Sequence, residues 1–112
     1  MYIQAIWRQD GGGTGSIAQV VEVDSWITAS LKLPDLYGGF KLTSLNNPPF
    51  AVDKVDTTGN CYICTFNQGG SQQTVYIFDK TFEGAYEQIR RTYFVEPDSI
   101  AETQLTYKNE KS

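Results

Sequence analysis

The sequence predicts an α+β domain built on an antiparallel sheet, and three observations predict it. Several segments alternate between apolar and polar residues, as half-buried strands do. Beyond residue 80 the period lengthens to that of an amphipathic helix. The composition is rich in strand-favouring residues, with seven Tyr, six Phe and eleven Thr. We expect five to seven short strands, with a partly open barrel as the variant, and one amphipathic helix near residues 80–93 packed on one face.

The length of the chain allows one domain. Of its 112 residues 40% are hydrophobic and 20% are charged, which is the composition of an ordinary small soluble protein. We expect residues 1–107 to form a single globular domain and residues 108–112 to form a frayed tail.

The first strands are predicted at residues 2–8 and 17–24, where apolar side chains recur at every second position. The glycine-rich residues 10–16 join them into an antiparallel hairpin with a long mobile tip. A third strand is predicted at residues 26–33 and ends at Pro34, because proline cannot donate a hydrogen bond to the ladder. Its apolar side consists of Ile27, Ala29, Leu31 and Leu33.

Further strands are predicted in the middle of the chain. A short one at residues 41–45 precedes a turn at residues 46–49. A second strand pair follows at residues 61–66 and 74–78, joined by the polar, glycine-containing residues 67–72.

The helix has a clear apolar stripe, which we expect to cover one face of the sheet. Asp79 or Thr81 is placed to cap its first turn, and Glu87 and Arg91 form a favourable pair one turn apart. The stripe consists of Phe82, Ala85, Tyr86, Ile89 and Tyr93.

Two structures stay open for the segment after Pro97. Ser99 and Glu102 have the spacing of a capping box at a helix start. Residues 101–107 also alternate like a short strand, which we favour because their Thr and Tyr residues suit one.

The net charge of −4 excludes partners that need a basic surface. The nine basic residues are scattered, so we expect neither nucleic acid nor an anionic membrane to bind. The chain opens with a strand-like pattern rather than a signal peptide, and no apolar stretch has the length of a membrane-spanning helix. We therefore expect a cytoplasmic protein whose cysteines are reduced.

Cys61 and Cys64 have the spacing of a redox or zinc motif, but they fall within a predicted strand. Residues three apart in a strand point to opposite faces with Cα atoms about 10 Å apart, too far for a disulfide. The chain has no histidine, so it cannot complete a usual zinc site alone. We interpret both thiols as structural and expect no metal and no cofactor; a four-thiolate site shared across a dimer is the remaining alternative.

The sequence contains no recognisable catalytic set. Without histidine, acid–base chemistry would depend on carboxylate pairs such as Asp53 with Asp56 or Glu22 with Asp24. Neither pair comes with a third polar group that would orient it. We therefore expect that the protein is not an enzyme.

The glycine-rich loop is the first candidate interface. Between Gly11 and Ser16 it lacks the lysine and the following helix of a phosphate-binding loop. We interpret this loop as a solvent-exposed hairpin tip. The alternative is that it orders against a partner, and Gly12, Gly13 and Thr14 are then the candidate interface residues.

The second candidate interface is the aromatic loop at residues 36–40, which contains Tyr37 and Phe40 and has Phe50 close in sequence. Aromatic residues beside glycine and proline form rigid exposed anchors of the kind enriched at interfaces. The other interpretation, which we favour, is that these three side chains fold back over the open end of the core.

The functional expectation is a non-enzymatic structural or assembly module that acts through protein–protein contacts. Its partner is another protein, or copies of itself in a homo-oligomer. Small accessory proteins of phage or virus particles have this general character, in which case the chain would be incorporated into the particle. One alternative is a standalone binder or inhibitor of a host or cellular protein, and a weaker one is a small-ligand pocket between helix and sheet.

Overall fold

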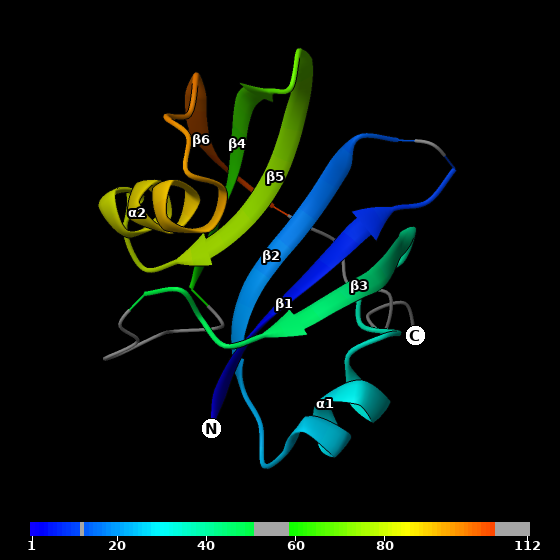
Figure 1. Cartoon of the computed structure of the whole chain (residues 1–112). Helices are drawn as coiled ribbons and strands as arrows, with labels where there is room; N and C mark the ends of the chain where they lie inside the picture. Colours follow the sequence, from blue (N-terminus) through cyan, green and yellow to red (C-terminus); the bar gives the residue numbers. More distant parts are fainter. Residues whose placement is uncertain (12, 51–58, 105–112) are drawn as a thin grey trace.

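The computed structural model describes residues 1–11, 13–50 and 59–104. In this part of the chain a six-stranded sheet carries one helix across one of its faces, and a second, shorter helix lies at the lower end of the sheet (Figure 1), where it packs into the core of the opposite face. The strand order is β3-β1-β2-β5-β4-β6, so the sheet is open, with β3 and β6 at its edges, and is not a barrel. The predicted α+β class with a mainly antiparallel sheet is confirmed.

Two strands precede the first helix, three strands lie between the two helices, and one strand follows the second helix. The strands are β1 (Tyr2–Gln9), β2 (Gly15–Glu22), β3 (Phe40–Asn46), β4 (Asn60–Gln68), β5 (Ser71–Asp79) and β6 (Ser99–Thr103). The helices are α1 (Trp26–Lys32) and α2 (Phe82–Tyr93).

Both predicted hairpins are present. β1 pairs antiparallel with β2, and β3 pairs with the other edge of β1. β4 pairs antiparallel with β5, and β6 pairs with the other edge of β4. The second hairpin is tighter than expected, because its strands continue to a two-residue turn at Gly69 and Gly70. Both glycines have positive φ angles, 62° and 84°, as a turn that matches the strand twist requires.

The two three-stranded units join along a short parallel seam. There β2 pairs with β5 from Gly15 beside Thr74 to Ala18 beside Ile77. Beyond these residues the two strands diverge, as Figure 1 shows. The seam lies in the middle of the sheet, and β2 is buried on both faces from Gly15 to Val21, as expected for a strand covered on both sides.

One face of the sheet carries what we call the α1-side core. Its centre is Trp7, whose indole Nε1 donates to the carbonyl oxygen of Leu33 over 2.9 Å. The ring of Tyr37 meets the ring of Trp7 edge-on, with centroids 4.9 Å apart. The Tyr37 hydroxyl donates to Oε1 of the buried Gln19 over 2.6 Å. Together these contacts fix α1 and the loop after it to the sheet.

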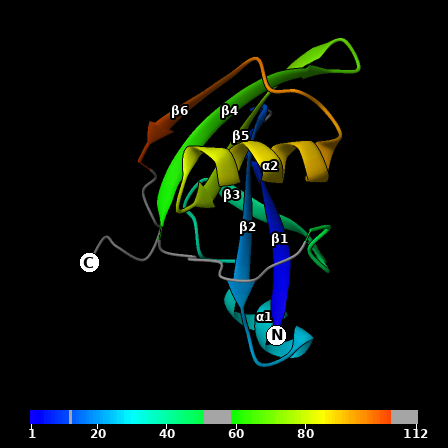
Figure 2. The same cartoon turned by 90° about the vertical axis from the view of Figure 1, so that its left-hand side faces the viewer.

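The opposite face carries the α2-side core, and Figure 2 shows α2 lying across it. Ala85 and Ile89 of α2 are buried against Phe66, Val75 and Ile77 of the sheet. In addition, Gln4 Nε2 of β1 donates to Thr92 Oγ1 of α2 over 2.9 Å. The helix therefore spans both three-stranded units.

The prediction of a strand at residues 26–33 is wrong, because this segment forms α1. Ser25 begins the helix, and its hydroxyl accepts a hydrogen bond from the backbone N–H of Thr28 over 3.1 Å. Ala29 and Leu33, one helical turn apart, are buried against the α1-side core. The alternating apolar residues thus form two pairs with helical spacing. The pair Ala29 and Leu33 faces inward, and the pair Ile27 and Leu31 does not.

The predicted helix near residues 80–93 is confirmed as α2. Thr81 caps it by accepting from the backbone N–H of Gly84 over 3.0 Å. A Cβ atom at Gly84 would lie only 2.0 Å from Asp79 Oδ1, which explains a glycine in the first turn. The inward stripe differs from the expected one, since Gln88 is buried and the side chain of Phe82 is 48% exposed.

The strand alternative for the end of the chain is confirmed over Ser99–Thr103, which form β6. The remainder of that expected strand, residues 105–107, and the expected tail at 108–112 lie outside the described residues.

Candidate protein-interaction surface

The aromatic loop does not expose Tyr37. Its side chain is only 2% exposed, and it lies between Trp7 and Phe78 in the α1-side core. The interpretation of Tyr37 as an exposed anchor is therefore wrong, and the other interpretation, that this side chain folds back over the core, is confirmed. The physical reason is that the buried amide of Gln19 supplies a hydrogen-bond acceptor for the hydroxyl, so that the whole phenol can be buried.

The other predicted interface residues occupy intermediate places. Phe40 is half-buried and meets Tyr76 edge-on, with ring centroids 6.3 Å apart. Phe50 is half-buried as well. In the glycine-rich loop Thr14 is exposed, Gly13 is half-buried and Gly12 lies outside the described residues. Contact of these residues with a partner stays a prediction.

The structure brings the two predicted interface segments together. The backbone N–H of Asp10, where the glycine-rich loop begins, donates to the carbonyl oxygen of Gly39 over 2.9 Å. A hollow of about 430 Å³ lies beside this contact. Its lining is mixed in character and includes Asp10, Pro34, Asp35, Phe40, Lys41 and Leu42.

The two cysteines lie on opposite faces of β4, as the strand prediction requires. Cys61 belongs to the α1-side core and Cys64 to the α2-side core. Burial raises the pKa of Cys61 to about 11. Burial, together with the neighbouring Cys61, raises the pKa of Cys64 to about 12. Both thiols are therefore protonated at neutral pH, which disfavours a role as nucleophile or metal ligand.

The remaining candidate chemical groups are not gathered into a site. Glu22 and Asp24 are both exposed near the end of β2. Asp53 and Asp56 lie outside the described residues. Across residues 1–11, 13–50 and 59–104, no three metal-ligating side chains come together.

The surface that sequence reasoning missed is the outer side of α1. Successive helical residues are about 100° apart around the axis, so Ile27 and Leu31 point away from the buried pair Ala29 and Leu33. Their exposed fractions are 73% and 76%. Trp26, at the start of the helix, is 41% exposed. We call these three exposed residues the α1 patch.

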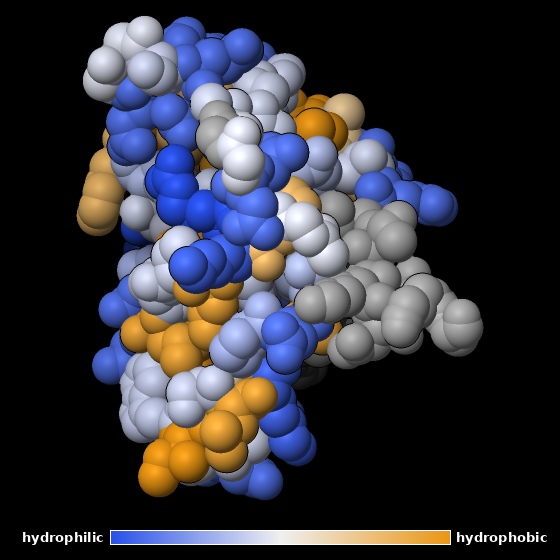
Figure 3. All heavy atoms as spheres, turned by 90° about the vertical axis from the view of Figure 1, so that its right-hand side faces the viewer, coloured by the Kyte–Doolittle hydropathy of each residue, from blue (hydrophilic) through white to orange (hydrophobic). Residues whose placement is uncertain are grey.

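The space-filling view shows the same feature. Figure 3 shows apolar atoms gathered at the lower end of the molecule, where α1 lies. An amphipathic surface helix normally presents polar side chains on its outer side. The sequence signal for this surface was that Ile27 and Leu31 form a second apolar pair four residues apart. In a strand, this pair would lie on the same side as Ala29 and Leu33.

The outer side of α2 has the opposite character. Arg91 Nε lies 2.8 Å from Glu87 Oε2, and Arg90 Nε lies 2.9 Å from Glu96 Oε2. Glu96 also accepts a hydrogen bond from the hydroxyl of Tyr86. Such a network is typical of a helix side that faces water.

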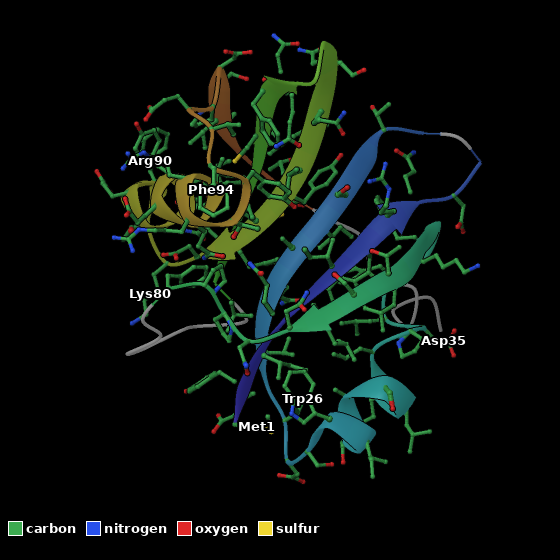
Figure 4. The ribbon with its side chains drawn as sticks, viewed as in Figure 1. Met1, Trp26, Asp35, Lys80, Arg90 and Phe94 are labelled. Carbon is green, nitrogen blue, oxygen red and sulfur yellow. The ribbon has the colours of Figure 1, made fainter. Side chains whose placement is uncertain are left out.

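Phe94 is the exception at the end of α2. It is 87% exposed and has a φ angle of 60°, a left-handed conformation that favours glycine. In Figure 4 it lies well away from Trp26, on a different element. It is a single exposed side chain, whereas α1 exposes Trp26, Ile27 and Leu31.

Comparison with protein-family models, with curated proteins and with solved structures found no match to this chain. Among the described residues, neither helix has the length and the apolar character needed to span a bilayer.

Proposed function

We propose that this chain is a non-enzymatic structural or assembly module that acts through protein–protein contacts, and that the α1 patch is its docking surface. The observation that carries the proposal is the second apolar pair of α1, Ile27 and Leu31, on the side opposite to the buried pair.

The energetics of α1 support a partner. Burying a leucine or isoleucine side chain completely contributes about 1.5–3 kcal/mol, and most of this is unrealised at Ile27 and Leu31 in the isolated chain. A helix of seven residues also has little stability of its own. A protein that covers the patch would bury both side chains and hold α1 in place from the second side.

The absence of enzymatic activity is part of the same proposal. Its support is the state of the reactive groups, since both thiols are buried and protonated at neutral pH. Carboxylates such as Glu22 and Asp24 are exposed to water, and no ion pair between described residues orients them.

A standalone binder is the second candidate, and one observation favours it. The hollow beside Phe40 and Lys41 combines the glycine-rich and aromatic loops on one surface, as a binding loop cluster does. The weaker alternative, a small-ligand pocket, can be tested at the same hollow. A ligand screen by thermal shift that raises no melting temperature would count against that alternative.

The proposal also covers where the protein assembles, either in the cytoplasm or within a phage or virus particle. A cytoplasmic module and a component of a phage or virus particle use the same kind of surface. Purification of particles from cells that produce this chain, followed by mass spectrometry, would detect it if it is incorporated and miss it if it is not.

The docking surface can be tested by photo-crosslinking in the producing cells. A photoreactive phenylalanine analogue at Leu31 is expected to give covalent adducts with protein, because this position would lie inside the interface. The matched control carries the analogue at Phe94, which is more exposed than Leu31 but lies outside the α1 patch. Adducts from position 94 without any from position 31 would overturn the proposal.

A further inference from the structure

We propose that the protein covering the α1 patch is a second copy of this chain, packed so that the two α1 helices run antiparallel about a two-fold axis. This inference rests on the proposed function and names its partner. Two features of α1 carry it: an apolar pair that is complementary to itself, and opposite charges at the two ends of the helix.

The apolar pair suits a two-fold contact. Ile27 and Leu31 are one helical turn apart on the outer side of α1. When two such helices cross antiparallel with the axis between these residues, Ile27 of each copy meets Leu31 of the other. A two-fold interface requires this reciprocity, in which residue i contacts j while j contacts i. The two side chains have similar volumes, so neither contact leaves a large void.

The charges select the antiparallel direction. Asp24 and Glu22 are exposed before the start of α1, and Lys32 is exposed in its last turn. Neither Asp24 nor Lys32 takes part in an ion pair between described residues. An antiparallel pair brings Lys32 of each copy toward Asp24 of the other, whereas a parallel pair would bring like charges together. Asp35, the next acidic residue, is already engaged in an interaction.

The extent of the patch sets the strength of the contact. A stable specific interface buries about 800 Å² on each partner, and the three side chains of the α1 patch supply only part of that area. We therefore expect a dimer that forms at micromolar and higher concentrations and dissociates on dilution.

The primary test is sedimentation equilibrium on the full chain from about 5 µM to about 500 µM. We expect the apparent mass to rise with concentration from 12.6 kDa toward twice that value. Leu31→Gln is expected to weaken the dimer at least about tenfold, with an unchanged circular dichroism spectrum because the side chain is exposed. Phe94→Asn removes an exposed apolar side chain elsewhere, and asparagine tolerates the left-handed conformation, so the dimer should be unaffected.

Charge reversal tests the orientation separately. Asp24→Lys and Lys32→Glu should each weaken the dimer, because each places like charges opposite one another. The double variant should restore it, because both intermolecular pairs return with their signs exchanged. A parallel or unrelated contact would show no such restoration.

The outcomes separate this inference from the proposed function. Self-association that responds to Leu31→Gln and to the charge reversals supports the two-fold contact. A monomer at every concentration, with crosslinks from position 31 to a different protein, overturns the inference and leaves the docking surface in place. A monomer without crosslinks from position 31 overturns both. A dimer that is lost in Phe94→Asn and kept in Leu31→Gln overturns the inference in favour of the end of α2.

Discussion

The two helices pack into the cores on opposite faces of one sheet, and their outer sides differ. α2 is twelve residues long and carries a network of ion pairs where it faces water. α1 is seven residues long and carries Ile27 and Leu31 there. Covering a core requires only an inner apolar stripe, so the inner sides of the two helices resemble each other. The outer side of a helix reflects what that side contacts. Only α2 has the charged residues that are typical of an outer side facing solvent.

The largest effects are expected in the two cores. Trp7→Ala on the α1 side and Phe66→Ala on the α2 side should each lower the free energy of unfolding by about 3–5 kcal/mol, since both side chains are fully buried. Urea titration measures this. Both tryptophans, Trp7 and Trp26, lie on the α1 side, so fluorescence follows that side while circular dichroism follows the whole chain. If Phe66→Ala shifted the circular dichroism transition without the fluorescence transition, the two sides would unfold independently.

Alkaline pH should destabilise both faces, because each contains a buried thiol. The pKa values of Cys61 and Cys64 are raised from 9.0 in the ordinary thiol to about 11 and about 12. Above pH 9 the unfolded chain therefore releases protons that the folded chain keeps, and the free energy of unfolding falls as pH rises from 9 toward 11. Below pH 8 these thiols give no pH dependence. Urea midpoints measured between pH 7 and pH 11 should show this decline, and Cys64→Ala should reduce its slope; an unchanged slope would contradict the assignment.

The same two thiols can report the opening of each face. In Cys64→Ala only Cys61 on the α1 side reacts with a thiol reagent, and in Cys61→Ala only Cys64 on the α2 side reacts. We expect Cys61 to react about tenfold faster, a difference of about 1.4 kcal/mol in opening free energy. The reason is that α1 is shorter than α2. Equal rates would mean that the two helices protect their faces equally.

The smallest effects are expected at the helix caps, which are alike in the two helices. Ser25→Ala removes the acceptor for the N–H of Thr28, and Thr81→Ala removes the acceptor for the N–H of Gly84. Each should lower the free energy of unfolding by about 1 kcal/mol, as thermal or urea unfolding would show. A much smaller loss for Ser25→Ala would indicate that α1 is held by packing of Leu33 and Ala29 rather than by its cap.

Much of the sheet could be predicted from the sequence because its strands obey simple patterns. The alternation around Trp7 and the strand pair around Cys61 each fit one structure only, and the Gly69-Gly70 turn adds a local signal. α1 could not be predicted in this way. Residues 26–33 alternate like a strand, yet Ala29 and Leu33 also have helical spacing, and the cap at Ser25 together with burial against Trp7 selects the helix.

The candidate surface was less accessible to sequence reasoning than the fold. The predicted anchor Tyr37 is buried because a glutamine distant in the sequence, Gln19, accepts a hydrogen bond from its hydroxyl group. The α1 patch is exposed because only one of two equivalent apolar pairs can face the sheet. Both outcomes depend on tertiary contacts, and composition or periodicity alone does not contain that information.

The short parallel seam between β2 and β5 has a consequence for how the chain folds. Each hairpin closes locally, whereas the seam joins Gly15 to Thr74 and must close a long loop first. We expect the hairpins to form before the transition state for folding and the seam to form after it. Substitutions at the seam, such as Ala18→Gly, should then accelerate unfolding more than they slow refolding.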